Sequence, residues 1–153
     1  MQILMIVGSE MGNAEMAGDL VKDELETQGH EVELMLEGGL VEAELEDRET
    51  LLLITSTTGL GEVPQGIEAL LDELLEERPD LTHLRFGLIG LGDRNYADTF
   101  CGAPKKFLAI LEDLGATRVA EALMLDATDN PAPDEDALEW LPGWLEELER
   151  LDA

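Results

Sequence analysis

The chain has 153 residues, of which 36 are acidic and 9 are basic, so its formal net charge at pH 7 is −27. This length fits one domain over residues 1–153, and a hydrophobic content of 44% supports a packed core, so the acidity does not indicate disorder. A single cysteine excludes an internal disulfide framework and agrees with a reducing cytoplasm, where we expect the protein to be located. A surface with this much negative charge repels nucleic acid and anionic lipid, so we expect neither nucleic-acid nor membrane binding.

The acidity has two compatible explanations that the sequence leaves open. One is adaptation to high salt, where the Debye length falls to about 3 Å and self-repulsion is screened. The low lysine content, three residues in all, fits this explanation slightly better. The other is electrostatic steering of a protein partner with a basic face.

The first third of the chain predicts two strands and one helix. Residues 2–8 (QILMIVG) form a nearly continuous apolar run, too short for a signal peptide or a membrane span and typical of a buried parallel strand. A stripe with helical spacing follows and ends at Gly29, a predicted C-cap; it consists of Ala14, Ala17, Val21 and Leu25. Residues 30–36 predict an edge strand, in which Val32, Leu34 and Leu36 alternate with Glu31, Glu33 and Met35. The acidic stretch 37–49 predicts one or two helical turns.

The remainder predicts three more buried strands and three helices. The strands are TLLLITS (50–56), RFGLIGLG (85–92) and EALMLDA (121–127). The apolar stripes of the helices are Ile67, Leu70, Leu71, Leu74 and Leu75, ending near Arg78-Pro79; Phe107, Ile110, Leu111 and Leu114, ending at Gly115; and Leu138, Leu141, Leu145 and Leu148. Pro142 interrupts the last stripe, so we expect a kink or a restart of the helix there.

This alternation of strands and helices predicts an α/β fold, a doubly wound parallel sheet with helices on both faces. Right-handed crossovers permit a five-stranded sheet of order 2-1-3-4-5, whose switch point lies between the first and third strands. Ligands bind such sheets beyond the carboxyl ends of the strands at the switch point. Three loops, 8–14, 56–66 and 92–104, therefore form the candidate site, and they are the chain's richest in Gly, Ser, Thr and Asn.

The first loop, GSEMGNAE (8–15), has no cationic side chain but leads into a helix N-terminus. Free amides and the helix dipole there can hold an anion, and Ser9 and Asn13 can donate further hydrogen bonds. The spacing matches neither the dinucleotide fingerprint nor the Walker loop. An ordinary strand-to-helix turn, with Gly12 serving backbone geometry, is the alternative.

The other two loops offer room and an aromatic ring. In STTGLGEVPQG (56–66), Gly59 and Gly61 leave the backbone open to a flat ligand; a long flexible turn is the alternative. In GLGDRNYADTFCGAP (90–104), Tyr96 is the chain's only tyrosine, and we expect it to contact ligand, whereas we expect Phe100 to pack in the core. The three loops together describe a site for a flat, phosphorylated cofactor.

At these motifs the chain resembles the short-chain flavodoxin family, most closely the MioC-type flavodoxins and the FMN domains of diflavin reductases. The resemblance runs from MIVGSEMGNAE to LDATDNPAPDEDALEWL, and TSTTGLGEVPQ and GLGDRNYADTFCGA are its most specific parts. It implies a flavodoxin-like fold and a monomeric FMN-binding carrier of electrons, not an enzyme. The expected partners are a flavodoxin reductase and an acceptor enzyme, both with basic faces.

The resemblance also assigns the cofactor-binding residues. Gly59 matches the glycine whose peptide reorients on protonation of flavin N5, and Tyr96 matches the aromatic residue that stacks on the ring. Asp126 falls where some relatives place an acidic residue beside the flavin. The phosphate loop maps to Ser9, Glu10, Met11, Gly12, Asn13 and Ala14; the ring-contacting loop maps to Ser56, Thr57, Thr58, Gly59, Leu60 and Gly61; the third loop maps to Gly92, Asp93, Asn95, Tyr96, Phe100 and Cys101.

The chain departs from the family pattern at three positions. Met11 and Ala14 replace hydroxyl residues, and each lost donor costs on the order of 1 kcal/mol of binding. Thr58 stands where many relatives carry an inner aromatic. We therefore expect weakened FMN binding, and a binding or regulatory module without a stable cofactor is the alternative function.

Other classes fit the sequence less well. A phosphorylated receiver domain needs acids where the first strand ends and an aspartate where the 50–56 strand ends, and this chain has Gly8-Ser9 and Thr55-Ser56 there. Hydrolase chemistry is disfavoured because both histidines, His30 and His83, lie at the starts of strands, away from the binding edge. Cys101 lies near the proposed ring, where redox chemistry is conceivable, but a packing thiol is the expected role. No metal site is expected.

Overall fold

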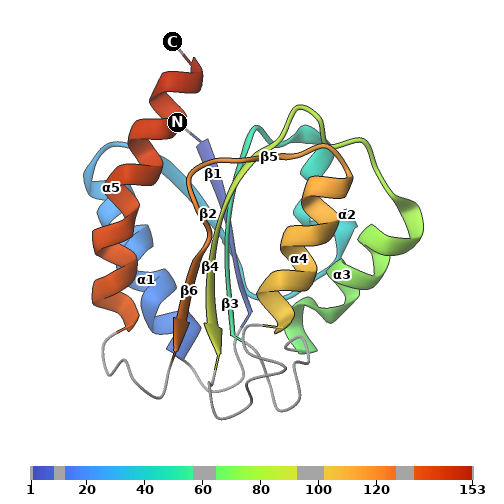
Figure 1. Ribbon diagram of the computed structural model, residues 1–153, viewed down its shortest axis with the longest axis horizontal. Coiled ribbons are helices and arrows are strands. Elements are labelled where there is room, and N and C mark those ends of the chain that lie inside the picture. The colour runs from blue at the N-terminus through green and yellow to red at the C-terminus, as the bar shows by residue number, and fades with distance from the viewer. Residues whose placement is uncertain (1, 9–12, 57–64, 93–101, 127–132, 153) are drawn as a thin grey trace.

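The computed structural model describes residues 2–8, 13–56, 65–92, 102–126 and 133–152 (Figure 1). Strands and helices alternate along the chain, as the apolar runs and helical stripes predict. In chain order the elements are β1 (Gln2–Gly8), α1 (Asn13–Thr27), β2 (Glu31–Met35), α2 (Leu40–Ala43), the 3-10 turn η1 (Leu45–Asp47), β3 (Thr50–Ser56), α3 (Gln65–Glu77), β4 (Arg85–Gly92), α4 (Gly102–Asp113), β5 (Thr117–Arg118), β6 (Leu123–Asp126) and α5 (Pro133–Asp152).

The sheet is parallel and its order is β2-β1-β3-β4, followed by β5 and β6, which both pair with β4. The predicted doubly wound order 2-1-3-4-5 is therefore confirmed. The last position, however, is occupied by two short strands instead of one strand over 121–127. β5 pairs with Arg85–Phe86 and β6 with Ile89–Gly92, and between them Ala120 adopts a left-handed backbone (φ 61°) that interrupts strand geometry.

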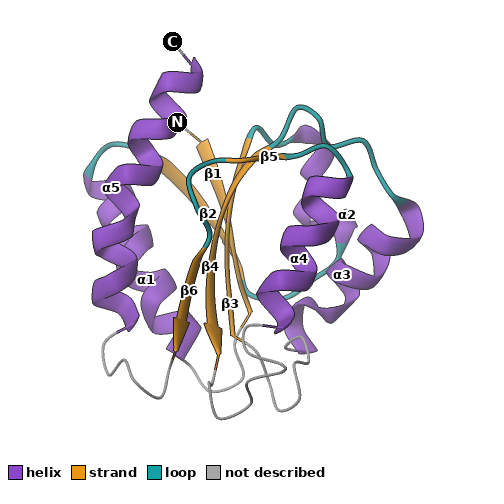
Figure 2. Cartoon of the chain, in the orientation of Figure 1, coloured by secondary structure: helices purple, strands orange, loops and turns teal. Residues whose placement is uncertain are grey.

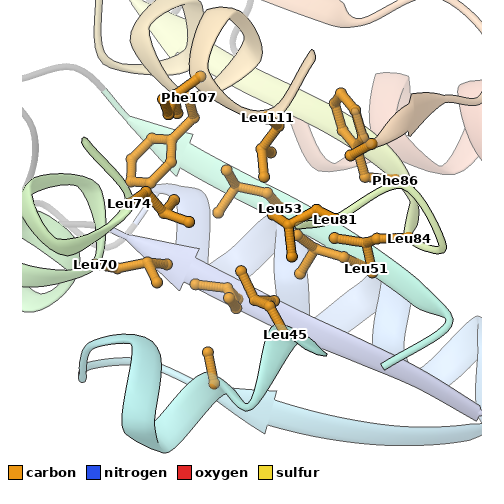
Figure 3. Packing of buried hydrophobic residues seen from close by; sticks show 14 of the residues in the cluster. Leu45, Leu51, Leu53, Leu70, Leu74, Leu81, Leu84, Phe86, Phe107 and Leu111 are labelled. Carbon is orange, nitrogen blue, oxygen red and sulfur yellow. The ribbon is translucent and has the colours of Figure 1, made fainter. Parts of the chain in front are cut away.

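Helices cover both faces of the sheet, α1 and α5 on one and α2, α3 and α4 on the other (Figure 1). Each face has its own core because side chains alternate along the strands: Leu51 and Leu53 point to one layer, and Leu52 and Ile54 to the other. Figure 3 shows the first layer, in which leucines of β3 and α3 meet Phe107 of α4.

Two helices end as predicted at glycines with a left-handed backbone. Gly29 has φ 93° and donates its N–H to the carbonyl of Glu26, while the N–H of His30 reaches Leu25 O. Gly115, with φ 95°, closes α4 in the same way. Both ends are Schellman motifs, which satisfy the last helical carbonyls and which glycine adopts without strain.

The structure corrects two details: the end of the edge strand and the restart of the last helix at Pro142. Leu36 lies beyond β2 and is 46% exposed, whereas Met35 packs against the α3–α4 layer, because the strand ends one residue before the predicted boundary. Helix α5 runs unbroken through Pro142, so the restart, one of the two outcomes expected there, does not occur, and the kink stays a prediction. Burial of Leu141, Trp144 and Leu148 against the sheet offsets the cost of about 3 kcal/mol for an internal proline.

Candidate functional site

The register of the sheet brings the ends of four strands to one edge. Gly8 of β1 lies opposite Thr55 of β3, which lies opposite Gly90 of β4, and Gly92 lies opposite Asp126 of β6. These carboxyl ends share one side of the molecule (Figure 2). The sequence order reverses between β1 and β3, so the predicted switch point lies at this edge.

Helix α1 begins at Asn13, close to the end of β1. A Cβ on Gly18 would lie 2.8 Å from Val7 Cγ2, so the absence of a side chain lets the first turns of α1 pack directly on the strand. The first four N–H groups of a helix have no intrahelical acceptor, and they carry about half a positive charge. Glu15 is the acidic residue of this first turn. The donor set is backbone amides, which suits a phosphate and does not require a cation.

The floor of this edge joins Gly8, the first residue of the 8–14 loop, to Thr55 and Ile67, which the sequence did not indicate as part of the site. Thr55 is fully buried at the end of β3, and a Cβ on the facing Gly8 would lie 3.0 Å from its Oγ1 and 2.4 Å from Ile67 Cδ1. Gly8 therefore lets β1, β3 and the start of α3 meet without a gap. The missed signal was a threonine inside an otherwise apolar run, directly before the loop.

The start of α3 is fixed from the other side. Gly38 N donates to Gly66 O at 2.9 Å, and a Cβ on Gly66 would lie 2.8 Å from Leu36 O. This contact ties α3 to the segment after β2, so the second candidate loop departs from Ser56 and rejoins the fold at an anchored helix. Its two attachment points are thus rigid elements of the sheet and of α3.

Four predicted cofactor-binding residues are described, and they fall on the ends of elements at this edge. Asn13 and Ala14 begin α1, Ser56 ends β3 and Gly92 ends β4. The other predicted residues lie outside the described residues: Ser9, Glu10, Met11, Gly12, Thr57, Thr58, Gly59, Leu60, Gly61, Asp93, Asn95, Tyr96, Phe100 and Cys101. Their contacts remain predictions.

Both histidines lie at the opposite, amino edge, as predicted. His83 Nε2 is 3.1 Å from Leu45 O, a structural contact. Burial lowers the pKa of His30, with a further contribution from the N-terminal charge, while Glu149 opposes the shift. Neither imidazole is placed to act at the carboxyl edge. Among the described residues, no group of His, Cys, Asp or Glu has the arrangement of a metal site.

The amino edge also holds a cavity of about 520 Å³ lined by Glu31, Glu49 and Arg48, among others. The Arg48 guanidinium forms an ion pair with Glu33 and donates a hydrogen bond to Ala43 O. Arg48 thus ties the turn before β3 to the edge strand β2. We assign this cluster a structural role.

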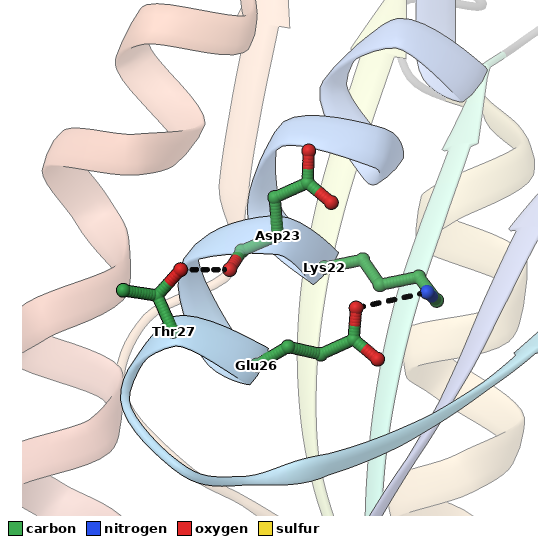
Figure 4. A network of polar contacts seen from close by, with 4 residues as sticks. All are labelled: Lys22, Asp23, Glu26 and Thr27. Atoms are coloured by element: carbon green, nitrogen blue, oxygen red, sulfur yellow. Dashed lines mark hydrogen bonds and ion pairs between the residues drawn. The ribbon is translucent and has the colours of Figure 1, made fainter.

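With 9 basic residues for 36 acidic ones, ion pairs can involve only a minority of the acidic side chains. In α1, Lys22 pairs with Glu26 at 3.0 Å (Figure 4). Thr27 Oγ1 donates to the backbone carbonyl of Asp23 at 2.8 Å, so this contact does not involve the Asp23 carboxylate. Exposed pairs of this kind contribute only a few tenths of a kcal/mol. In the part of the chain that the structure describes, no helix combines the length and apolar character needed to cross a bilayer.

Comparison with known proteins decides the family. The family model described as Flavodoxin matches residues 5–140. The chain belongs to the flavodoxin family. It is 39% identical to Protein MioC of Escherichia coli K12 over 94% of this chain and 95% of that protein, and 36% identical to flavodoxin YqcA of Pectobacterium carotovorum over 95% of each.

Solved structures agree with this assignment. A flavodoxin variant from Pseudomonas aeruginosa superposes with a TM-score of 0.88 at 32% identity, over 97% of this chain and 99% of that one. Oxidised Flavodoxin 2 from Bacillus cereus superposes with a TM-score of 0.80, also at 32% identity, over 96% and 99%. The predicted resemblance to flavodoxins and the flavodoxin-like fold are confirmed.

Proposed function

We propose that this flavodoxin-family protein binds FMN at the carboxyl edge of its sheet and carries electrons from a reductase to acceptor enzymes. The observation that carries the proposal is the N-terminus of α1, packed against the end of β1 at the switch point. It offers amide donors where this fold places a ligand phosphate.

The chain's own residues bind and orient the cofactor. The amides at Asn13 and Ala14, with residues 9–12, hold the phosphate; the segment from Ser56 to Gly61 contacts the ring, and Tyr96 stacks on it. The bound flavin supplies the redox chemistry, and the protein tunes it by stacking, hydrogen bonding and the surrounding field. We propose a carrier with no substrate turnover of its own.

The charge suggests how partners find the site. A net charge of −27 attracts a basic face and accelerates its encounter with the protein, and salt weakens this steering. We propose basic-faced redox proteins as partners, a monomeric carrier and a cytoplasmic location. The same negative field disfavours adding electrons to a bound flavin, so it lowers the reduction potential.

A visible absorption spectrum of the purified protein, recorded before and after addition of FMN, tests the proposal. We expect flavin bands with quenched fluorescence and a binding stoichiometry of one. The decisive second measurement is reduction of the bound flavin by a flavodoxin reductase, followed by reoxidation by an acceptor. A colourless protein that ignores added FMN would instead favour the module without a stable cofactor.

A further inference from the structure

The solvent side of α1 carries two large apolar side chains one helical turn apart. Met16 is 60% exposed and Leu20 is 38% exposed. Four positions separate them, so they are neighbours on the helix surface, away from the buried stripe that includes Ala17 and Val21. In the described part of the chain, α3, α4 and α5 each have at most one large apolar side chain that is exposed to this extent.

A row of carboxylates runs beside this apolar pair. Glu15, Asp19 and Asp23 are exposed and follow one another at intervals of four residues, so they also lie one turn apart. In the described part of the chain, none of the three carboxylates has an ion pair or a hydrogen bond. Like charges at this spacing repel each other and destabilise a helix, so a cation supplied from outside would remove a cost that the chain leaves uncompensated.

The basic residue of α1 does not offset the row. Lys22 pairs with Glu26 at 3.0 Å, and the Asp23 carboxylate takes no part in this contact (Figure 4). The side of the helix that we call the α1 face is therefore an apolar pair bordered by unpaired carboxylates, and it consists of Glu15, Met16, Asp19, Leu20 and Asp23.

The α1 face lies beside the proposed cofactor site. Helix α1 begins at the carboxyl edge of the sheet, Glu15 belongs to its first turn, and Met16 follows directly (Figure 1). A protein seated on this face is held next to the edge at which the proposed flavin exchanges electrons.

We propose that the α1 face docks the redox partner, and that this partner presents an aliphatic or aromatic side chain between lysine or arginine residues. The apolar side chain covers Met16 and Leu20 and removes their surface from water. The flanking cations pair with the carboxylate row. The inference rests on the proposed function, to which it adds the side chains that recognise the partner and the chemistry of the partner's face.

Other occupants fit the charge of this face less well. A second copy of the chain carries the same charge of −27 and is repelled. Nucleic acid and anionic lipid are repelled for the same reason. A basic protein face with an apolar centre complements both the carboxylate row and the apolar pair.

The two components of the α1 face differ in their response to salt. At 1 M salt the Debye length is about 3 Å, so attraction between exposed charges is screened. Burial of apolar surface does not depend on charge and persists at this salt concentration. The apolar pair therefore keeps the partner bound where the net charge no longer attracts it.

The test is the affinity of a purified flavodoxin reductase for the FMN-loaded protein, measured by calorimetry at 0.1 M and 2 M KCl. Met16→Gln combined with Leu20→Gln should weaken binding about tenfold at both salt concentrations, the scale of losing an apolar anchor. Asp19→Asn combined with Asp23→Asn should weaken binding about fivefold at 0.1 M KCl, the scale of two exposed charge pairs, and should have no effect at 2 M.

Matched controls lie on other helices. Leu75→Gln combined with Leu151→Gln likewise replaces two exposed apolar side chains. Asp72→Asn combined with Glu76→Gln removes two exposed carboxylates one turn apart on α3, so the net charge changes by the same amount. Both controls should bind the reductase as the parent does.

Four results would overturn the docking face. They are no binding of the reductase by the parent, parental affinity in the variant of Met16 and Leu20, equal losses in the two carboxylate variants, and self-association of the parent through this face. The measurement is repeated without flavin, and the flavin content of each variant is read from its absorption spectrum. Absence of flavin would count against the proposed function, whereas reductase binding reports on the α1 face in either state.

Discussion

The indole rings of Trp140 and Trp144 stack within α5, with centroids 5.7 Å apart and planes inclined by 18°. Trp140 Nε1 donates to Glu121 O at 2.9 Å, and Trp144 is fully buried over Gly87 of β4. A Cβ on Gly87 would lie 2.4 Å from Trp144 Nε1. We therefore expect Gly87→Ala to force the rings apart and to lower the free energy of unfolding by about 1–3 kcal/mol, measured by urea denaturation.

Gly143→Ala is the matched control in the same helix. A Cβ there would meet nothing within 4 Å, so replacement by alanine should raise the free energy of unfolding by up to about 1 kcal/mol. Equal effects of the two substitutions would contradict the packing of the tryptophan pair against β4.

Gly8→Ala probes the floor of the candidate site. The added methyl group would compete with Ile67 Cδ1 and press against Thr55 Oγ1, so Ile67 or the start of α3 must shift. We expect a loss of about 1–3 kcal/mol of stability together with weaker FMN binding, measured by denaturation and by fluorescence titration. Gly8→Ala with Ile67→Val should recover part of both. A variant that loses stability but keeps its FMN affinity would separate this floor from the cofactor site.

Met11 and Ala14 stand where the family pattern has hydroxyl residues, so restoring a hydroxyl at either position should raise the affinity for FMN. Met11→Thr and Ala14→Ser should each tighten FMN binding about fivefold, the equivalent of one hydrogen bond of about 1 kcal/mol. Isothermal titration of the apoprotein measures the change. If neither substitution tightens binding, the loop already satisfies the phosphate through its amides.

His30 should make stability depend on pH near neutrality. Burial lowers its pKa in the folded state, and its Nδ1 is buried without a hydrogen-bond partner among the described residues. As pH falls through the unfolded pKa of about 6.5, the unfolded chain binds more protons than the folded one, so stability falls until the folded pKa is reached.

Urea denaturation of the parent and His30→Gln between pH 8 and pH 5 measures this linkage. The variant should lose less stability than the parent over that range. Glu149→Gln removes the carboxylate that opposes the shift, so it should steepen the loss. Parallel pH profiles for the parent and His30→Gln would rule out a contribution from this imidazole.

The net charge predicts that salt stabilises the protein. At 1 M salt the Debye length is about 3 Å, so repulsion among exposed carboxylates is screened. The melting temperature should rise between 0.1 M and 2 M KCl, and the reduction potential of the bound flavin should rise with it. An uncharged osmolyte at matched osmolality is the control. A melting temperature that does not change with KCl concentration would favour partner steering as the sole explanation of the acidity.

The sequence predicted the layers of the fold better than its interruptions. Apolar runs identify the buried strands, and stripes with helical spacing identify the helices. Gly29 and Gly115 mark helix ends because glycine adopts the left-handed backbone of a C-cap without strain. The break at Ala120 has no such signal, since alanine rarely adopts a left-handed backbone and tertiary packing imposes it. Helix continuity through Pro142 likewise depends on burial of Trp144, a long-range effect.

For the site, the sequence located the edge but not its floor. Loops rich in Gly, Ser and Thr after the strands 2–8, 50–56 and 85–92 indicated where a ligand would bind. The contact among Gly8, Thr55 and Ile67 depends on register between distant segments, which local pattern does not reveal. The apolar stripe of α3 likewise does not distinguish Leu71, which is buried, from Leu75, which is 51% exposed.

The two margins of the sheet have a consequence for self-association into fibrils. One margin is β2, where the acidic Glu31 and Glu33 are exposed, and the other is divided into β5 and β6 by the turn at Ala120. At β2 the negative charge repels the strand of a second copy, and at β5 and β6 the row of backbone hydrogen-bonding groups is interrupted, so both margins are poor templates for another strand. The interruption at Ala120 between β5 and β6 thus disfavours the addition of another strand at this margin.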